Sequence, residues 1–217
     1  MFDFNLERAL LMMPAILFGF SIHEFSHAIA AVKLGDRTPE EQGRLTLNPL
    51  VHLDLIGFVL FFIAGFGWAK PVQTNPNAYK NPRRDDILVS VAGPLSNLVG
   101  AVFFAILFKV IIQFYQGLLT NPTYGNQLKT MLIYFIWVNI ILAIFNLIPI
   151  PPLDGSHILF DILPYRFQSF KERFFQFGSI ILIGIILIEN NTKMDILPIG
   201  KAGMAIFNGL FGILGIN

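Results

Sequence analysis

Residues 9–34 read ALLMMPAILFGFSIHEFSHAIAAVKL, an apolar run that contains the ionisable side chains His23, Glu24 and His27. A helix rises 1.5 Å per residue, so about 20 residues cross the hydrocarbon core of a bilayer, and this run is long enough. Ionisable groups at that depth are costly and by default mark functional positions. The run therefore predicts a first membrane span that carries a reactive site.

The composition of the whole chain is that of a membrane protein. Of 217 residues, 54% are hydrophobic and 13% are charged, about half the charged share of a soluble domain. The net charge of +1 gives no reason to expect nucleic acid as a partner. There is no cysteine, so a metal site must use carboxylates and the 4 histidines. We expect a lipid bilayer around the protein.

The other apolar runs predict an all-α polytopic membrane protein with about five to six membrane segments. After the first span we expect spans at residues 87–114, 131–148, 174–188 and, as a span or an interfacial helix, 199–216. The run 55–66 is too short for a span and contains glycines, which favours a re-entrant loop or a membrane-dipping β-hairpin. A hairpin over residues 58–72 could bind an extended peptide by strand addition.

The ends of the runs and the charges between them suggest how the chain is organised. Asp3 and Glu7 precede the first run and no A-x-A-like cleavage site follows it, so we expect a retained span and not a signal peptide.

Seven bases lie between the first span and the span that begins at residue 87: Lys33, Arg37, Arg44, Lys70, Lys80, Arg83 and Arg84. The positive-inside rule places this connection in the cytoplasm, and with it the histidine-bearing end of the first helix.

The motif HEFSH, residues 23–27, predicts a zinc site. Residues i and i+4 share one helix face, so the imidazoles of His23 and His27 can reach one metal ion. Glu24 lies on the flank of that face, where it can accept a proton from water that zinc activates and later donate it to a leaving amine. The alternative is a pair of polar residues hydrogen-bonded within a helix bundle.

Catalytic zinc needs a third protein ligand, and Asp154 in PIPPLDGSH (149–157) is the candidate. It is an acid at the end of a predicted span, after a rigid proline run. Asp-Gly after prolines is also ordinary turn chemistry. From the local sequence alone, a turn acid that caps a helix beginning near Ser156 is the better interpretation.

HEFSH in a first span together with NLIPIPPLDG (146–155) after a later one resembles the site-2 protease family of intramembrane zinc metalloproteases (peptidase family M50). The resemblance runs from about residue 22 to 157 and includes GRLTLNPLVHLDLIG (43–57), GWAKPV (67–72) and NPRRDDILVSVAGPLSNL (81–98). The second motif of the family is roughly N-x-x-P-x-x-x-L-D-G. The chain is similar to the compact branch, which lacks PDZ and CBS domains.

The resemblance implies a set of roles. His23, His27 and Asp154 would bind one Zn²⁺ ion, and Glu24 would be the general acid and base. Asn146 would help to hold substrate or the oxyanion; the alternative is an interhelical hydrogen bond. The expected substrate is a transmembrane protein or peptide, cleaved at a site near the cytoplasmic side of a prokaryotic plasma membrane. Residues 1–217 would form one protease domain, with a catalytic core over about 9–160 and C-terminal membrane segments over about 174–217.

The remaining polar residues in these motifs keep two interpretations each. His52 could orient substrate or stabilise the tetrahedral intermediate, or it could be a solvated interfacial side chain. His157 could support Asp154, although local structure is the simpler interpretation. In AGPLSN (92–97) we expect close helix approach at Gly93 and an interhelical polar contact at Asn97, for which a direct catalytic role is the alternative.

Two other functional classes compete with the protease. A metal transporter also places histidines and acids inside the membrane, but it predicts several sites along one pathway. A non-catalytic scaffold derived from a protease predicts loss of catalytic groups. The presence of Glu24 and of all three candidate ligands favours the enzyme.

Overall fold

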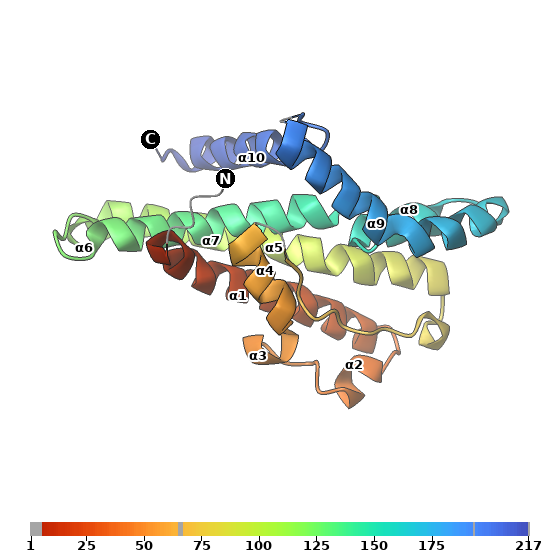
Figure 1. Cartoon of the computed structure of the whole chain (residues 1–217). Coiled ribbons are helices and arrows are strands. Elements are labelled where there is room, and N and C mark those ends of the chain that lie inside the picture. Colours follow the sequence, from red (N-terminus) through yellow and green to blue (C-terminus); the bar gives the residue numbers. More distant parts are fainter. Residues whose placement is uncertain (1–5, 65–66, 193, 217) are drawn as a thin grey trace.

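The computed structural model describes residues 6–64, 67–192 and 194–216, and within these ranges the regular secondary structure is entirely helical (Figure 1). The elements in chain order are α1 (Leu6–Lys33), α2 (Thr38–Glu41), α3 (Pro49–His52), α4 (Leu55–Ala64), η1 (Pro76–Ala78), α5 (Pro82–Phe114), α6 (Gln116–Leu119), α7 (Gly125–Asn146), α8 (Asp154–Ile162), η2 (Tyr165–Phe167), α9 (Gln168–Thr192) and α10 (Ile199–Leu214). The all-α prediction is confirmed for the described residues.

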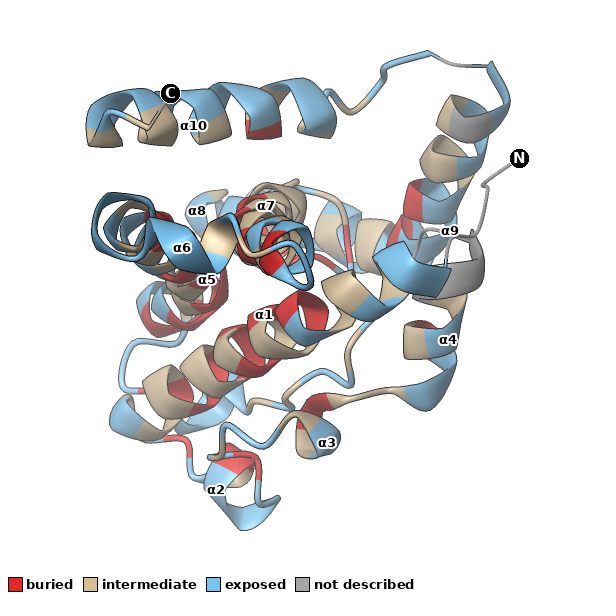
Figure 2. Ribbon diagram, turned by 90° about the vertical axis from the view of Figure 1, so that its left-hand side faces the viewer, coloured by how far each residue is buried: buried red, intermediate tan, exposed pale blue. Residues whose placement is uncertain are grey.

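Helices α1, α5 and α7 pack against one another and form the centre of the molecule (Figure 1). Each is long and apolar enough to cross a bilayer. Buried residues lie on the sides of these helices that face each other (Figure 2). Large hydrophobic side chains such as Val99 and Phe103 are exposed. Apolar groups outside and polar groups such as Asn97 and Asn139 inside suit a surface in contact with lipid. The chain is an integral membrane protein.

Three of the expected membrane segments thus correspond to helices of spanning length. The segments expected at 174–188 and 199–216 lie in α9 and α10. Helix α10 has 16 residues, about 24 Å at 1.5 Å per residue, which is less than the roughly 30 Å of a hydrocarbon core. It packs along α7 through Phe207, which contacts Trp137. A crossing by α9 or α10 stays a prediction.

The predicted β-hairpin over residues 58–72 is wrong for the residues described. Residues 55–64 form helix α4, and residues 67–72 are extended without a strand partner; Gly65 and Phe66 lie outside the described residues. A short apolar run has no periodicity that separates a strand from a buried helix, and here the helix forms. At 10 residues, α4 is about 15 Å long and too short to span.

A tight turn joins α7 to α8 and fixes where α8 begins. Leu153 N–H donates to the Ile150 carbonyl at 3.0 Å, and the Ser156 hydroxyl donates to the Leu153 carbonyl at 2.7 Å. Helix α8 then starts at Asp154, and no side-chain hydrogen bond caps it. The interpretation of Asp154 as a helix cap is therefore not supported, and its carboxylate is free to face α1.

We expect Gly155→Ala to lower the stability of the helix bundle. A Cβ at this position would overlap the backbone of Leu147 and Ile148, which cannot move as a side chain can. Overpacking of this kind typically costs about 1–3 kcal/mol. Detergent-denaturation titration of the purified protein measures the change. Gly184→Ala is the matched control, because nothing lies within 4 Å of the added atom. Equal stability of the two variants would contradict the role of the turn.

Candidate metal centre

His23 and His27 lie one helical turn apart on the buried face of α1. Their Nε2 atoms are 3.0 Å apart, and both side chains are buried. The four-residue spacing brings two side chains of one helix onto one face, as the motif predicts. Both imidazoles therefore direct the same ring nitrogen to the same point.

The opposite ring nitrogens are hydrogen-bonded to helix α5. His27 Nδ1 lies 2.8 Å from the Val89 carbonyl oxygen, and His23 Nδ1 lies 2.7 Å from Asn97 Oδ1. A carbonyl oxygen only accepts, so each Nδ1 must carry the proton. In the neutral imidazole Nε2 then presents a lone pair, which is the form that binds a metal.

Asn97 is itself held in one orientation. Its Nδ2 donates to the Gly19 carbonyl at 3.0 Å and to Asn139 Oδ1 at 2.9 Å. Since the donors are used in this way, Oδ1 is the atom that accepts from His23. Asn139 is in turn fixed by its own bond to the Phe135 carbonyl at 2.7 Å. The network runs from α7 through α5 to the ring on α1.

Asp154, at the start of α8, is the third member of the group and lies far along the sequence from the two histidines. Its Oδ2 lies 3.2 Å from His23 Nε2 and its Oδ1 lies 3.3 Å from His27 Nε2. Burial raises the pKa of Asp154, whereas the positive charge of the imidazolium forms of His27 and His23 holds it below its usual range. A bound metal cation would supply that positive charge when the rings are neutral. The group is therefore a carboxylate, the form in which an acid binds metal.

The donor set fits a zinc ion. One nitrogen or oxygen from each of the three residues lies within 4.8 Å of the others. Two Nε2 lone pairs and a buried Asp154 Oδ2 without a hydrogen-bond donor converge on one point. That arrangement is repulsive without a cation between its members. Two histidines and one carboxylate, with room for a fourth ligand, are typical of catalytic zinc.

Gly93 lets α5 approach the histidines. A Cβ on Gly93 would overlap the His27 ring and crowd His23. The close approach predicted for AGPLSN is confirmed, as is the interhelical contact of Asn97. The function of Asn97 as the partner of a candidate ligand was not evident from the sequence, because a buried asparagine in a span has many partners open to it.

Glu24 is buried next to the two histidines. Its Oε2 accepts a hydrogen bond from Val72 N–H at 2.8 Å. Val72 belongs to the extended segment 67–75, which follows α4. The segment thus covers the flank of α1 on which the general base is expected. No periodicity or motif in the sequence indicates this contact, since it uses a backbone amide.

His52 lies outside the group of candidate ligands, and the hydrogen bonds described for His52 and Asn146 go to other parts of the chain. His52 is buried, and its Nε2 bonds the Thr46 carbonyl at 2.7 Å, so it is not the solvated side chain of the alternative interpretation. Asn146 ends α7, and its Nδ2 donates to the Leu142 carbonyl at 3.0 Å. The catalytic functions expected for these two residues stay predictions.

His157 belongs to a separate polar cluster between α5 and α8. Its Nδ1 lies 3.3 Å from Asp86 Oδ2, and Lys171 Nζ lies 3.0 Å from Asp161 Oδ1. Burial and the nearby Asp86 carboxyl raise the pKa of Asp161. The cluster ties α8 to α5 near the candidate metal centre, which agrees with the interpretation of His157 as local structure.

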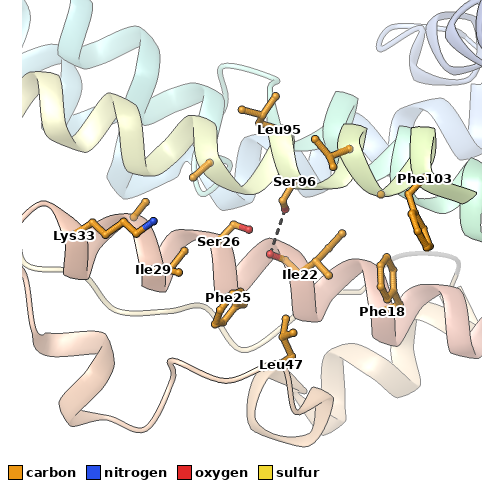
Figure 3. A pocket seen from close by; sticks show the side chains of 14 residues that line it. Phe18, Ile22, Phe25, Ser26, Ile29, Lys33, Leu47, Leu95, Ser96 and Phe103 are labelled. Atoms are coloured by element: carbon orange, nitrogen blue, oxygen red, sulfur yellow. Dashed lines mark hydrogen bonds between the residues drawn. The ribbon is translucent and has the colours of Figure 1, made fainter.

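An apolar groove of about 670 Å³ lies on another side of α1, between α1 and α5 (Figure 3). Phe18, Ile22, Leu95 and Phe103 are among its lining residues. The groove is not lined by any of the candidate metal ligands or by Glu24. It is therefore distinct from the metal centre.

We expect Asn97→Ala to weaken zinc binding by about 10- to 100-fold, the usual effect of removing the hydrogen-bond partner of a metal ligand. The ring of His23 would lose the acceptor that fixes its tautomer and orientation. Competition with a chromophoric chelator measures the affinity. Ser96→Ala is the control, because Ser96 bonds only the Gly93 and Ile22 carbonyls. Equal affinity of Asn97→Ala and wild type would count against the network.

Comparison with known proteins agrees with this geometry. The model of Peptidase family M50 matches residues 11–188. The candidate zinc metalloprotease YwhC of Bacillus subtilis is 35% identical over 217 residues, covering 96% of this chain and 98% of YwhC. The candidate zinc metalloprotease Rip2 of Mycolicibacterium smegmatis is 30% identical over 82% of this chain and 67% of Rip2. No solved structure gives a significant match. The chain belongs to peptidase family M50 and is a zinc metalloprotease.

Proposed function

We propose that this chain is an intramembrane endopeptidase that hydrolyses peptide bonds in or beside transmembrane segments of substrate proteins. The observation that carries the proposal is the position of His23 and His27, buried in a helix of spanning length. A peptide bond can reach His23 and His27 within such a helix only from the bilayer or from the edge of the bilayer. A substrate helix must also unwind there, because its peptide bonds are shielded.

His23, His27 and Asp154 would hold one Zn²⁺ ion and leave a coordination position open. When bound, zinc would polarise the scissile carbonyl and activate water for attack. The protein supplies the orientation of the ligands. Asn97 and the Val89 carbonyl fix the two rings, and the turn before α8 brings the carboxylate to them. The site therefore forms only when α1, α5 and α8 are packed.

Glu24 would be the general base and then the general acid. It would take a proton from the attacking water and pass it to the nitrogen of the leaving amine. Its position directly after His23 in α1 puts it on the flank of the ligand face, and burial keeps it apart from bulk water. The hydrogen bond from Val72 holds one of its two carboxylate oxygens.

Asn146 and His52 would assist in different ways. We propose that the Asn146 amide donates to the developing oxyanion, an interaction typically worth roughly 3 kcal/mol. Its Nδ2 carries two hydrogens, and one of them donates to the Leu142 carbonyl, so the other remains for the oxyanion. His52 Nε2 bonds the Thr46 carbonyl, and its buried Nδ1 has no hydrogen-bond partner among the described residues. We propose that His52 acts from this loop, which it holds through the Thr46 carbonyl.

We propose that the chain lies in a prokaryotic plasma membrane with the metal centre towards the cytoplasm. The support is the cluster of bases in the connection between α1 and α5, which includes Arg37, Arg44 and Lys70. This connection also contains the segment 67–75 next to Glu24, so the polar side would supply the water that hydrolysis consumes. We further propose that residues 1–217 act as one protease domain.

A metal transporter is less well supported. It requires several ligand groups along a path, and among the described residues the histidine and acid ligands gather in one group, His23, His27 and Asp154. A non-catalytic scaffold would not need a buried acid, Glu24, beside that group.

We expect Glu24→Gln to keep zinc and to lose cleavage of a model transmembrane substrate by at least about 100-fold, because a proton-transfer group contributes 10²–10⁴ in rate. Asp154→Ala should lose zinc and cleavage together. Zinc content by elemental analysis and cleavage by gel assay give the two readouts. Glu40→Gln, at an exposed ion pair with Arg37, is the matched control. Normal cleavage by Glu24→Gln would show that the proposed mechanism is wrong.

A further inference from the structure

The segment 67–75 crosses the flank of α1 and is fixed there by hydrogen bonds that its backbone amides donate. Lys70 N–H donates to the His52 carbonyl at 2.8 Å, and Asn75 N–H donates to Asp36 Oδ2 at 2.7 Å. Between these two points, Val72 N–H donates to Glu24. The segment is thus attached on both sides of the residue that contacts the catalytic base.

Arg44 makes a third attachment, directly before Val72. One guanidinium nitrogen donates to the Pro71 carbonyl at 3.1 Å, and another donates to the carbonyl of Val51 in α3. The guanidinium therefore joins α3 to the residue that precedes Val72. A shift of Pro71 would move the Val72 amide relative to Glu24.

The surroundings of Arg44 are unusual for an arginine. The residue is only 5% exposed, and within the described part of the chain it has no ion pair with an acid. A buried charge without a counter-ion is costly, and buried charges are normally paired. Its donors go to two backbone carbonyls instead. A cost of this kind is expected where a particular backbone position matters for function.

We propose that Arg44 is a positioning residue for Glu24, acting through Pro71 and Val72. The proposal rests on the proposed function, in which Glu24 transfers the proton. By fixing Val72 N–H on Glu24 Oε2, Arg44 holds the carboxylate in one orientation. The other oxygen of the carboxylate, Oε1, is then the one that exchanges a proton with the substrates.

The two bonds require a guanidinium. Its planar donors are set at a fixed separation and can reach two carbonyl oxygens at once. A lysine ammonium is a compact point charge and would keep one attachment at most. Arg44→Lys therefore keeps the charge and most of the volume but should loosen the link between α3 and the segment.

The test compares Arg44→Lys and Arg44→Gly with wild type, using the full chain in detergent and a model transmembrane substrate. Zinc content should be unchanged in both. We expect kcat per bound zinc to fall by roughly 10- to 100-fold, because a misplacement of about 1 Å can cost that much, with little change in KM. Added guanidinium at millimolar concentration should restore part of the kcat of Arg44→Gly. Arg37→Lys, on the exposed side of the same connection, is the control.

Hydrogen exchange gives a readout that does not depend on activity. The amides of Lys70 and Val72 should exchange faster in Arg44→Lys, while the amides of α7 should not change. Wild-type kcat per bound zinc in both variants, or unchanged exchange at Val72, would overturn the proposal. Loss of zinc together with activity in both variants would also overturn it, because Arg44 would then serve folding. If the zinc-loaded wild type cleaves no substrate, the proposed function is contradicted instead. Hydrogen exchange at Lys70 and Val72 would then still show whether Arg44 holds the segment 67–75.

Discussion

Each imidazole on α1 has two nitrogens, and each nitrogen needs a partner. Inside the helix bundle neither bulk water nor lipid supplies one. Polar groups left without hydrogen bonds inside a membrane cost several kcal/mol each. The Nδ1 atoms of His23 and His27 donate to α5, and the Nε2 atoms face Asp154 of α8, with which they would share a metal ion. This requirement determines which faces of α1, α5, α7 and α8 pack together.

The same constraint explains why the interior of the bundle is polar at its centre. Asn97 and Asn139 are fully buried and bond each other, and Asn97 connects them to the ring of His23. Glycines flank this network where helices come close, as at Gly93. Interhelical hydrogen bonds and close packing are what holds helices together in lipid, where burial of apolar surface gives little driving force. In this protein those forces also orient the candidate metal ligands.

The polar connection between α1 and α5 has a different physical basis. It lacks a long helix, and its position depends on buried polar side chains that bond backbone groups, such as Arg44 and His52. It reaches the metal centre through one backbone amide, that of Val72. The candidate ligands thus come from packed helices, whereas the residue that contacts Glu24, the proposed general base, comes from a loop.

Several features were predictable from the sequence because they follow from local spacing. The span that carries HEFSH, the shared face of His23 and His27, and the close approach at Gly93 all depend on the helical repeat and on residue size. The pairing with Asp154 was predicted from resemblance to a family and not from its surroundings, which favoured a turn. The hairpin over residues 58–72 was predicted wrongly, because a short apolar run such as 55–66 does not distinguish a helix from a strand.

The sequence by itself determined that a helix of spanning length carries two histidines on one face with an acid beside them. The helical repeat and the hydrophobicity of residues 9–34 are enough for that. Only the tertiary structure decided what surrounds them: the Val89 carbonyl and Asn97 on one side, Asp154 on another, and the Val72 amide on Glu24. Backbone groups carry no sequence signal, and contacts between residues 48 to 131 positions apart arise only when the helices pack.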